Sequence, residues 1–196
     1  PANDLFWRFN MRRLSAEEVR DSILAVNGRL NLKMYGPGIY PLISQEVLQG
    51  QSQPGKGWGD SSEEERSRRS VYIFVKRSLV TPLLFNFDFA DTDSSCAVRF
   101  VTTQPAQALG MINGQFANRQ AELFAERLIE EAGTEYPRFV TRAIRLAYGR
   151  TPHAGEVEDG VQLIKRLMEK HSLKEKQALD YFCLTILNRN EFVYLD

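Results

Sequence analysis

The sequence predicts a mainly α-helical domain of the α+β class. We expect a C-terminal antiparallel helical bundle and a small two- or three-stranded sheet from the N-terminal half. Apolar residues alternate with polar ones in segments before residue 103, which is typical of strands, and afterwards recur about every 3.6 residues, which is typical of helices. The change of period predicts a single domain over residues 1–196, with mixed structure over 1–102 and helices over 103–196.

Three segments of the first half have strand-like patterns. In residues 5–11, Leu5, Trp7, Phe9 and Met11 alternate with polar side chains. Residues 71–75 alternate Val and Ile with bulkier residues, and residues 98–101 are a short third candidate. These three segments are the candidates for the small sheet.

One helix and one long irregular segment separate these strand candidates. Ser15 and Glu18 form a capping-box pattern before an apolar helical stripe, which Gly28 ends. Glycine and proline dominate residues 31–60, so we expect a long loop, and loops of that length are usually functional or mobile. The charge run at 61–69 predicts a short solvated helix.

The second half predicts four or five helices joined by short connections, which imply antiparallel neighbours. Gly114, Gly133 and Gly149 interrupt successive apolar stripes. A second capping-box pattern, Ser172 to Glu175, marks the start of the last helix. The final ten residues combine a polar turn with an aromatic, aliphatic end, so we expect this terminus to be docked rather than loose.

Charge balance narrows the classes of partner. Lysine and arginine number 25, aspartate and glutamate number 25, and the formal net charge is zero. This balance gives no electrostatic reason to expect nucleic acid or an anionic membrane surface as the main partner. No apolar run is long enough to span a bilayer, and no basic-then-apolar leader follows Pro1, so we expect any export signal to lie outside these residues.

The acidic loop is the nearest approach to a metal site. Asp88, Asp91 and Asp93 offer the hard oxygen ligands that calcium takes. An EF-hand starting at Asp91 fails, because Cys96 stands where glycine is needed and Thr102 where the closing glutamate is needed. The alternative is a turn capped by aspartate side chains.

Trp58 and several arginines are candidates for ligand binding. Trp58 lies in a glycine-rich loop, where it either stacks on a sugar or a partner or pins the loop as a hydrophobic plug. Arg77 and Arg99 flank predicted strands, where a guanidinium can hold a carboxylate or sulfate. Alternatively Arg20, Arg77 and Arg99 pair with nearby acids such as Asp21, Asp88 or those of the acidic loop and lock strands onto helices.

Cysteine and histidine give few routes to catalysis or cofactor binding. Cys96 and Cys183 are either two thiols or one disulfide, and no Cys-x-x-Cys-His motif attaches haem to this chain. His153 and His171 have no histidine neighbour at metal-ligand spacing. We therefore expect this chain to hold no haem or other cofactor. Calcium, bound by the acidic loop, is the one candidate.

Several ordered motifs together resemble a known family. The motifs are Arg12-Arg13-Leu14-Ser15-Ala16-Glu17-Glu18-Val19-Arg20-Asp21-Ser22, Arg69-Ser70-Val71-Tyr72 with Lys76-Arg77-Ser78, Phe87-Asp88, Cys96-x-x-Arg99 with Thr102-Thr103-x-Pro105-x-Gln107-Ala108-Leu109, and Leu187-Asn188-x-Asn190-Glu191-Phe192. With these motifs the chain resembles the planctomycete-specific domain of unknown function that ends large exported proteins with planctomycete cytochrome c-like domains.

The resemblance implies context rather than a reaction. It implies export to the periplasm or cell surface, with other domains of the parent protein, haem domains among them, or envelope glycans as partners. An oxidising compartment makes a Cys96–Cys183 disulfide an expectation. The family supplies no catalytic residues to carry over.

The leading hypothesis for function is therefore a non-catalytic interaction or scaffolding domain. The alternative is a glycan-binding or glycan-acting enzyme domain of the cell envelope, with Trp58, Arg77, Asp88, Asp91 and Asp93 around one cleft. A third option is an electron-transfer platform for neighbouring haem domains, which requires a flat aromatic patch.

Overall fold

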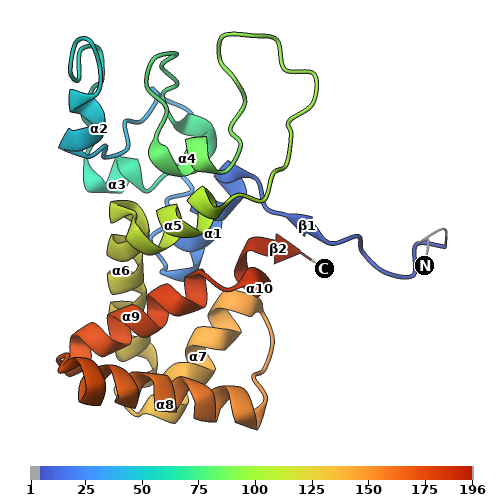
Figure 1. Ribbon diagram of the computed structural model, residues 1–196, viewed down its shortest axis with the longest axis vertical. Coiled ribbons are helices and arrows are strands. Elements are labelled where there is room, and N and C mark those ends of the chain that lie inside the picture. The colour runs from blue at the N-terminus through green and yellow to red at the C-terminus, as the bar shows by residue number, and fades with distance from the viewer. Residues whose placement is uncertain (1–4, 196) are drawn as a thin grey trace.

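The computed structural model describes residues 5–195 and is mainly helical (Figure 1). The helices are α1 (Ala16–Val26), α2 (Gln45–Gln49), α3 (Glu63–Arg66), α4 (Pro82–Asn86), α5 (Pro105–Asn113), α6 (Gln115–Ala132), α7 (Tyr136–Tyr148), α8 (Ala154–His171), α9 (Glu175–Leu187) and α10 (Asn190–Val193), with a 3₁₀ helix at Ser70–Tyr72 and the strands β1 (Arg12–Arg13) and β2 (Tyr194–Leu195). The predicted fold class is confirmed.

The C-terminal half is the expected helical bundle. Helix α6 packs against α9, and α7 and α9 both pack against α8. Phe124, Phe139 and Ile164 are fully buried in its core. Gly160 allows a close approach, since a Cβ atom there would lie 2.7 Å from the Val140 side chain. Hydrophobic burial therefore holds this half together.

The predicted capping box at Ser172 was wrong, although the predicted helix exists. Ser172 ends α8 with a φ of 52°, in the left-handed region. Helix α9 is capped two residues later, where the backbone N–H of Lys174 donates to Gln177 at 3.1 Å. The Ser-x-x-Glu pattern overlaps a Lys-x-x-Gln pattern, and the chain uses the second.

The sheet joins the two ends of the described chain. Strand β1 pairs antiparallel with β2, with Arg12 opposite Leu195 and Arg13 opposite Tyr194. The backbone N–H of Leu14 extends the pairing by donating to the carbonyl of Val193 at 2.8 Å. The C-terminal segment is thus docked, as expected, and one strand comes from the C-terminal end rather than from the N-terminal half.

The three strand candidates were assigned incorrectly. Residues 5–11 stay outside the sheet, because β2 offers only two residues for pairing and these are taken by β1. Residues 71–75 include part of the 3₁₀ helix and contribute only a single bridge, from Ile73 to Ile39. Residues 98–101 lie in an exposed loop. A period of two is not sufficient for a strand without a partner backbone.

Buried arginines organise the N-terminal half, beginning with Arg20 on α1. Arg20 is 4% exposed and donates to the carbonyl of Arg68 at 3.0 Å and to the hydroxyl of Ser70 at 3.1 Å. Burial lowers the pKa of Arg20 to about 10, against the opposing effect of Asp21. Asp21 in turn accepts from the backbone N–H of Ser70 at 2.8 Å. This pair fixes the segment after α3 on α1.

Arg68 extends the same network to the long irregular segment. Its side chain is fully buried and donates to the carbonyls of Lys33, Tyr35 and Pro37 and to the carboxylate of Glu65. Its guanidinium carbon also lies 3.9 Å from the centre of the Tyr72 ring. One arginine thus holds the loop of residues 33–37, which lacks regular structure, in place.

Among residues 5–195, none of the helices has the length and apolar composition needed to cross a membrane.

We predict that Arg68→Ala destabilises the protein far more than Arg69→Ala. Removal of Arg68 leaves several carbonyls without a donor in the interior, which costs about 3 kcal/mol of unfolding free energy. Arg69 is its exposed neighbour, and its truncation costs less than about 0.5 kcal/mol. Urea unfolding measures both variants. Equal midpoints would show that the buried arginine does not hold this half.

Candidate functional site

Asp88 closes the base of the long loop between α4 and α5. Its backbone has a φ of 60°, and its carboxylate accepts from the backbone N–H of Thr102 at 2.8 Å and from Arg13 at 2.6 Å. Partial burial acts to raise the pKa of Asp88, but the Thr102 hydrogen bonds and the Arg13 charge outweigh it and hold the pKa below its usual value. Arg13 itself is buried and lies over the Phe87 ring. Asp88 is therefore a structural anchor.

The carboxylates of the acidic loop do not converge on one point at which calcium could bind. Asp91 accepts from the backbone N–H of Asp93 at 2.9 Å and from the Ser94 hydroxyl at 2.8 Å, which is the geometry of an aspartate-capped turn. Asp88 faces Arg13 instead. Within residues 5–195 there is no group of three or more His, Cys, Asp or Glu side chains placed to hold a metal ion. The structure therefore does not support calcium binding by Asp88, Asp91 and Asp93 together.

Trp58 is half-buried and pins its loop. Its indole N–H donates to the carbonyl of Pro41 at 3.2 Å, and its ring lies edge-on to Tyr40 at 5.5 Å and to Phe74 at 6.2 Å. Gly59 permits this packing, because a Cβ atom there would lie 2.7 Å from the Tyr40 ring. The geometry is that of the plug rather than of an exposed stacking platform.

The two candidate arginines of the ligand site have different partners. Arg77 is 81% exposed and faces Asp93 at 3.9 Å. Arg99 donates to Glu17 of α1 at 2.7 Å and lies over the Phe89 ring, so it fastens the 89–101 loop to the body of the protein. Of the residues expected around one cleft, Arg77, Asp93 and Asp91 thus contact one another in an exposed cluster. Asp88 pairs with Arg13 instead, and Trp58 bonds to Pro41.

The two cysteines are free thiols. Cys96 is exposed on the 89–101 loop, whereas Cys183 is buried in the bundle on α9. Burial raises the pKa of the Cys183 thiol, and the charge of Asp180 adds to the shift. The structure thus lacks the expected disulfide and leaves Cys183 in an unreactive, neutral form.

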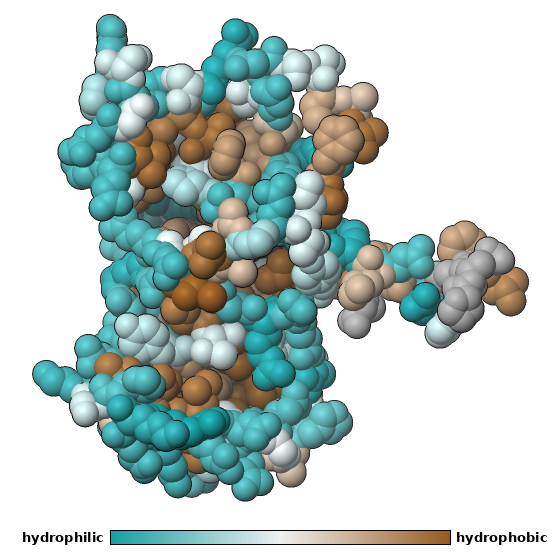
Figure 2. Space-filling view, in the orientation of Figure 1, coloured by the Kyte–Doolittle hydropathy of each residue, from teal (hydrophilic) through white to brown (hydrophobic). Residues whose placement is uncertain are grey.

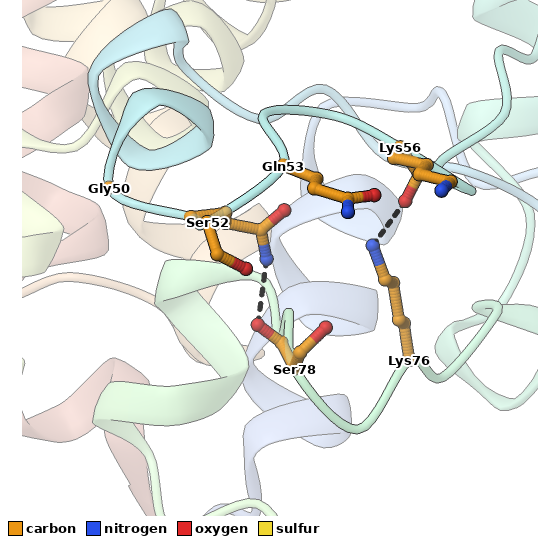
Figure 3. A pocket seen from close by; sticks show the side chains of 7 residues that line it. Gly50, Ser52, Gln53, Lys56, Lys76 and Ser78 are labelled. Carbon is orange, nitrogen blue, oxygen red and sulfur yellow. Dashed lines mark hydrogen bonds between the residues drawn. The ribbon is translucent and has the colours of Figure 1, made fainter.

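An open pocket lies at a place that no sequence pattern indicated. Its volume is about 520 Å³, and it is open and lined by polar side chains of two segments (Figure 3). The lining residues are Gly50, Gln51, Ser52, Gln53, Lys56, Lys76 and Ser78. None of the predicted ligand residues is among them. Serine, glutamine and lysine are ordinary surface residues, so only their juxtaposition identifies the pocket.

An apolar arm is the second feature that could bind a partner. Residues 5–11 extend away from the body beyond β1, and much of this projection is hydrophobic (Figures 1 and 2). Leu5 is 87% exposed, Trp7 66% and Phe9 58%. The sequence pattern identified these residues correctly as a group, but as a strand rather than as an exposed arm.

Polar residues of the sequence motifs form the internal framework. The motif residues Arg13, Arg20, Asp21, Ser70, Asp88, Thr102 and Gln107 all make hydrogen bonds or ion pairs within the chain. Gln107, for example, is buried and donates to the carbonyl of Thr102 at 3.0 Å. These side chains form hydrogen bonds that stabilise the fold and do not surround a shared cleft.

The fold and these sites define a mainly α domain in which motif residues have structural roles. The chain belongs to the family PSD1, described as a protein of unknown function (DUF1553), whose model matches residues 1–164. The match ends within α8, so the closing motif at residues 187–192 lies beyond it. No curated protein and no solved structure matches the chain.

We predict that Asp88→Ala lowers stability by about 2–3 kcal/mol, because it leaves the buried Arg13 charge unpaired. Asp91→Ala removes only an exposed turn contact and costs less than about 1 kcal/mol. Both effects are expected to be the same with calcium and with a chelator. A calcium-dependent rise in the wild-type unfolding midpoint that Asp91→Ala abolishes would restore the calcium hypothesis.

We also predict a strong difference in reactivity between the two thiols. Cys96 reacts with a thiol reagent in the native protein, whereas Cys183 reacts only after unfolding, because the bundle excludes the reagent and suppresses the thiolate. Counting thiols before and after denaturation, without reductant, measures both. Loss of both thiols in protein made in an oxidising compartment would instead demonstrate the Cys96–Cys183 bond.

Proposed function

We propose that this protein is a non-catalytic interaction domain that docks onto another polypeptide through its apolar arm, residues 5–11. The observation that carries the proposal is the exposure of Leu5, Phe6, Trp7, Phe9 and Met11 on one projecting segment, each at least 58% accessible. Large aromatic side chains are enriched at protein interfaces and contribute most of the binding energy there.

The position of the arm suits pairing with a partner strand. It continues directly into β1, which belongs to a two-stranded sheet in the described part of the chain. A strand in such a sheet has one edge without a neighbouring strand, so its backbone groups can accept an added strand. The alternating apolar side chains would then enter pockets on one face of the partner.

Motif resemblance supports a more specific context. We propose that the partner is another domain of an exported planctomycete protein, with haem domains of the cytochrome c type among the candidates. The zero net charge is compatible with recognition by apolar contact rather than by a strong electrostatic field. Export to the periplasm or cell surface, like the cytochrome association, rests on the resemblance alone.

The test is binding of this domain to the separately purified remaining domains of its parent protein. The double variant Trp7→Ser, Phe9→Ser is expected to raise the dissociation constant by about 30-fold or more, which is the effect of losing a hot-spot residue. Tyr181→Ser on α9, an aromatic side chain that is 48% exposed and outside the arm, is the matched control and is expected to bind normally.

Two results would contradict the proposal. One is equal affinity of the arm variant and the Tyr181→Ser control. The other is turnover of a polysaccharide that is lost on Trp58→Ala, which would favour the glycan-acting alternative.

A further inference from the structure

The polar pocket lies between two segments that are far apart in the chain. Residues 50–56 form one wall and residues 76–78 the other (Figure 3). Gln51 donates its side-chain amide to the carbonyl of Ser78 at 2.7 Å, and the Lys76 ammonium donates to the carbonyl of Lys56. These two bonds bridge the walls and set the width of the pocket.

The lining is rich in hydrogen-bond donors and positively charged. Lys56 and Lys76 contribute two ammonium groups, Ser52 and Ser78 two hydroxyls, and Gln53 an amide. No aspartate or glutamate occurs among the described residues that line it. Two positive charges without a lining carboxylate create a potential that attracts anions.

Lys76 has donors to spare for a ligand. An ammonium group carries three N–H donors, and the structure uses one of them on the carbonyl of Lys56. Its side chain is half-buried, so a charge-assisted hydrogen bond from it is less screened by solvent than one from a fully exposed lysine. Lys76 is therefore the residue best placed to bind an oxyanion.

An acceptor in the same pocket also lacks a partner. The Oε1 atom of Gln51 is buried and accepts no hydrogen bond from the described residues. Most buried polar side-chain atoms have a partner, so such an atom calls for a donor from outside the chain. A ligand hydroxyl supplies one, whereas a bare oxyanion does not.

We propose that this pocket binds a small ligand that carries both an oxyanion and a hydroxyl group, such as an acidic sugar. Lys76 and Lys56 hold the carboxylate, phosphate or sulfate, and Gln51 accepts from a hydroxyl. The volume of about 520 Å³ lies within the usual range for small-molecule sites. This binding is independent of the apolar arm.

Trp58 acts as a positioning residue for this pocket. The wall at residues 50–56 leads directly into Trp58, whose indole is fixed to Pro41 and packed on Tyr40 and Phe74. The tryptophan therefore holds the end of the pocket wall without lining the pocket.

Calorimetric titration of the whole chain tests the proposal with four probes: glucuronate, glucose 6-phosphate, glucose and inorganic sulfate. We expect glucuronate and glucose 6-phosphate to bind more tightly than glucose or inorganic sulfate, because only they satisfy both the ammonium groups and Gln51. Lys76→Gln is expected to weaken this binding by about ten-fold or more, as loss of a charge-assisted hydrogen bond does.

Three variants separate ligand binding from folding. Lys76→Arg keeps the charge and is expected to restore most of the affinity. Lys165→Gln removes an exposed lysine of α8, far from the pocket in the sequence, and is expected to leave the affinity unchanged. Trp58→Ala is expected to weaken binding while Lys56 and Lys76 remain present. Thermal unfolding of each variant confirms that it is folded.

Several outcomes would overturn the proposal. They are no binding of either acidic sugar at millimolar concentration, equal binding of glucose and glucuronate, binding of inorganic sulfate as tight as that of glucose 6-phosphate, or the same loss of affinity in Lys165→Gln as in Lys76→Gln. Because Trp7 and Phe9 lie outside the pocket, failure here leaves the docking function of the arm untouched, and failure of arm docking leaves the pocket untouched.

Discussion

The N-terminal half of this protein depends on the requirement that a buried guanidinium must be hydrogen-bonded. Transfer of an unpaired charge into a protein interior is strongly unfavourable, so a buried arginine fixes the position of every acceptor that it needs. Arg68 uses three backbone carbonyls and one carboxylate in this way. Arg20 of α1 donates to the carbonyl of Arg68 itself. The irregular segment is therefore fixed to α1 through Arg68.

The two halves of the chain are thus stabilised by different means. In the bundle, long helices bury Phe139, Phe182 and their neighbours, and non-directional hydrophobic burial is sufficient. In the first half the helices apart from α1 are short, and α1 packs against α4 and the 3₁₀ helix. Directional bonds from arginine to backbone carbonyls supplement this packing, which explains how a glycine- and proline-rich segment takes one defined path.

This difference also explains what could be predicted from the sequence. Helix boundaries at Gly114, Gly133 and Gly149 are local signals, and the structure follows them. Strands need a partner that local patterns do not contain, so residues 98–101 resemble a strand and form a loop. Arg68 looks like any other residue of a charge run, because its burial depends on carbonyls about thirty residues earlier in the chain.

The candidate sites were predictable to the same limited degree. Trp58 and Asp88 were recognised as special, and the structure shows why: each fixes one end of a long loop. Their roles could not be distinguished from ligand binding by residue type, because an aromatic ring or a carboxylate serves either purpose. The polar pocket was missed altogether, since it is formed by two segments far apart in the sequence that the Gln51–Ser78 and Lys76–Lys56 bonds bring together.

The residues that fasten the exposed segments to the body of the protein indicate where a binding function can change without loss of the fold. The 89–101 loop is fastened by Asp88, the 50–56 loop by Trp58, and the arm by the pairing of β1 with β2. Each segment is fixed at its base and exposed beyond it, which is the usual way in which a rigid scaffold presents functional loops. Because the anchors use separate residues, a change in the tip of one segment alters neither the core nor the other two. Docking by the arm and ligand binding in the pocket are therefore separable properties of one framework.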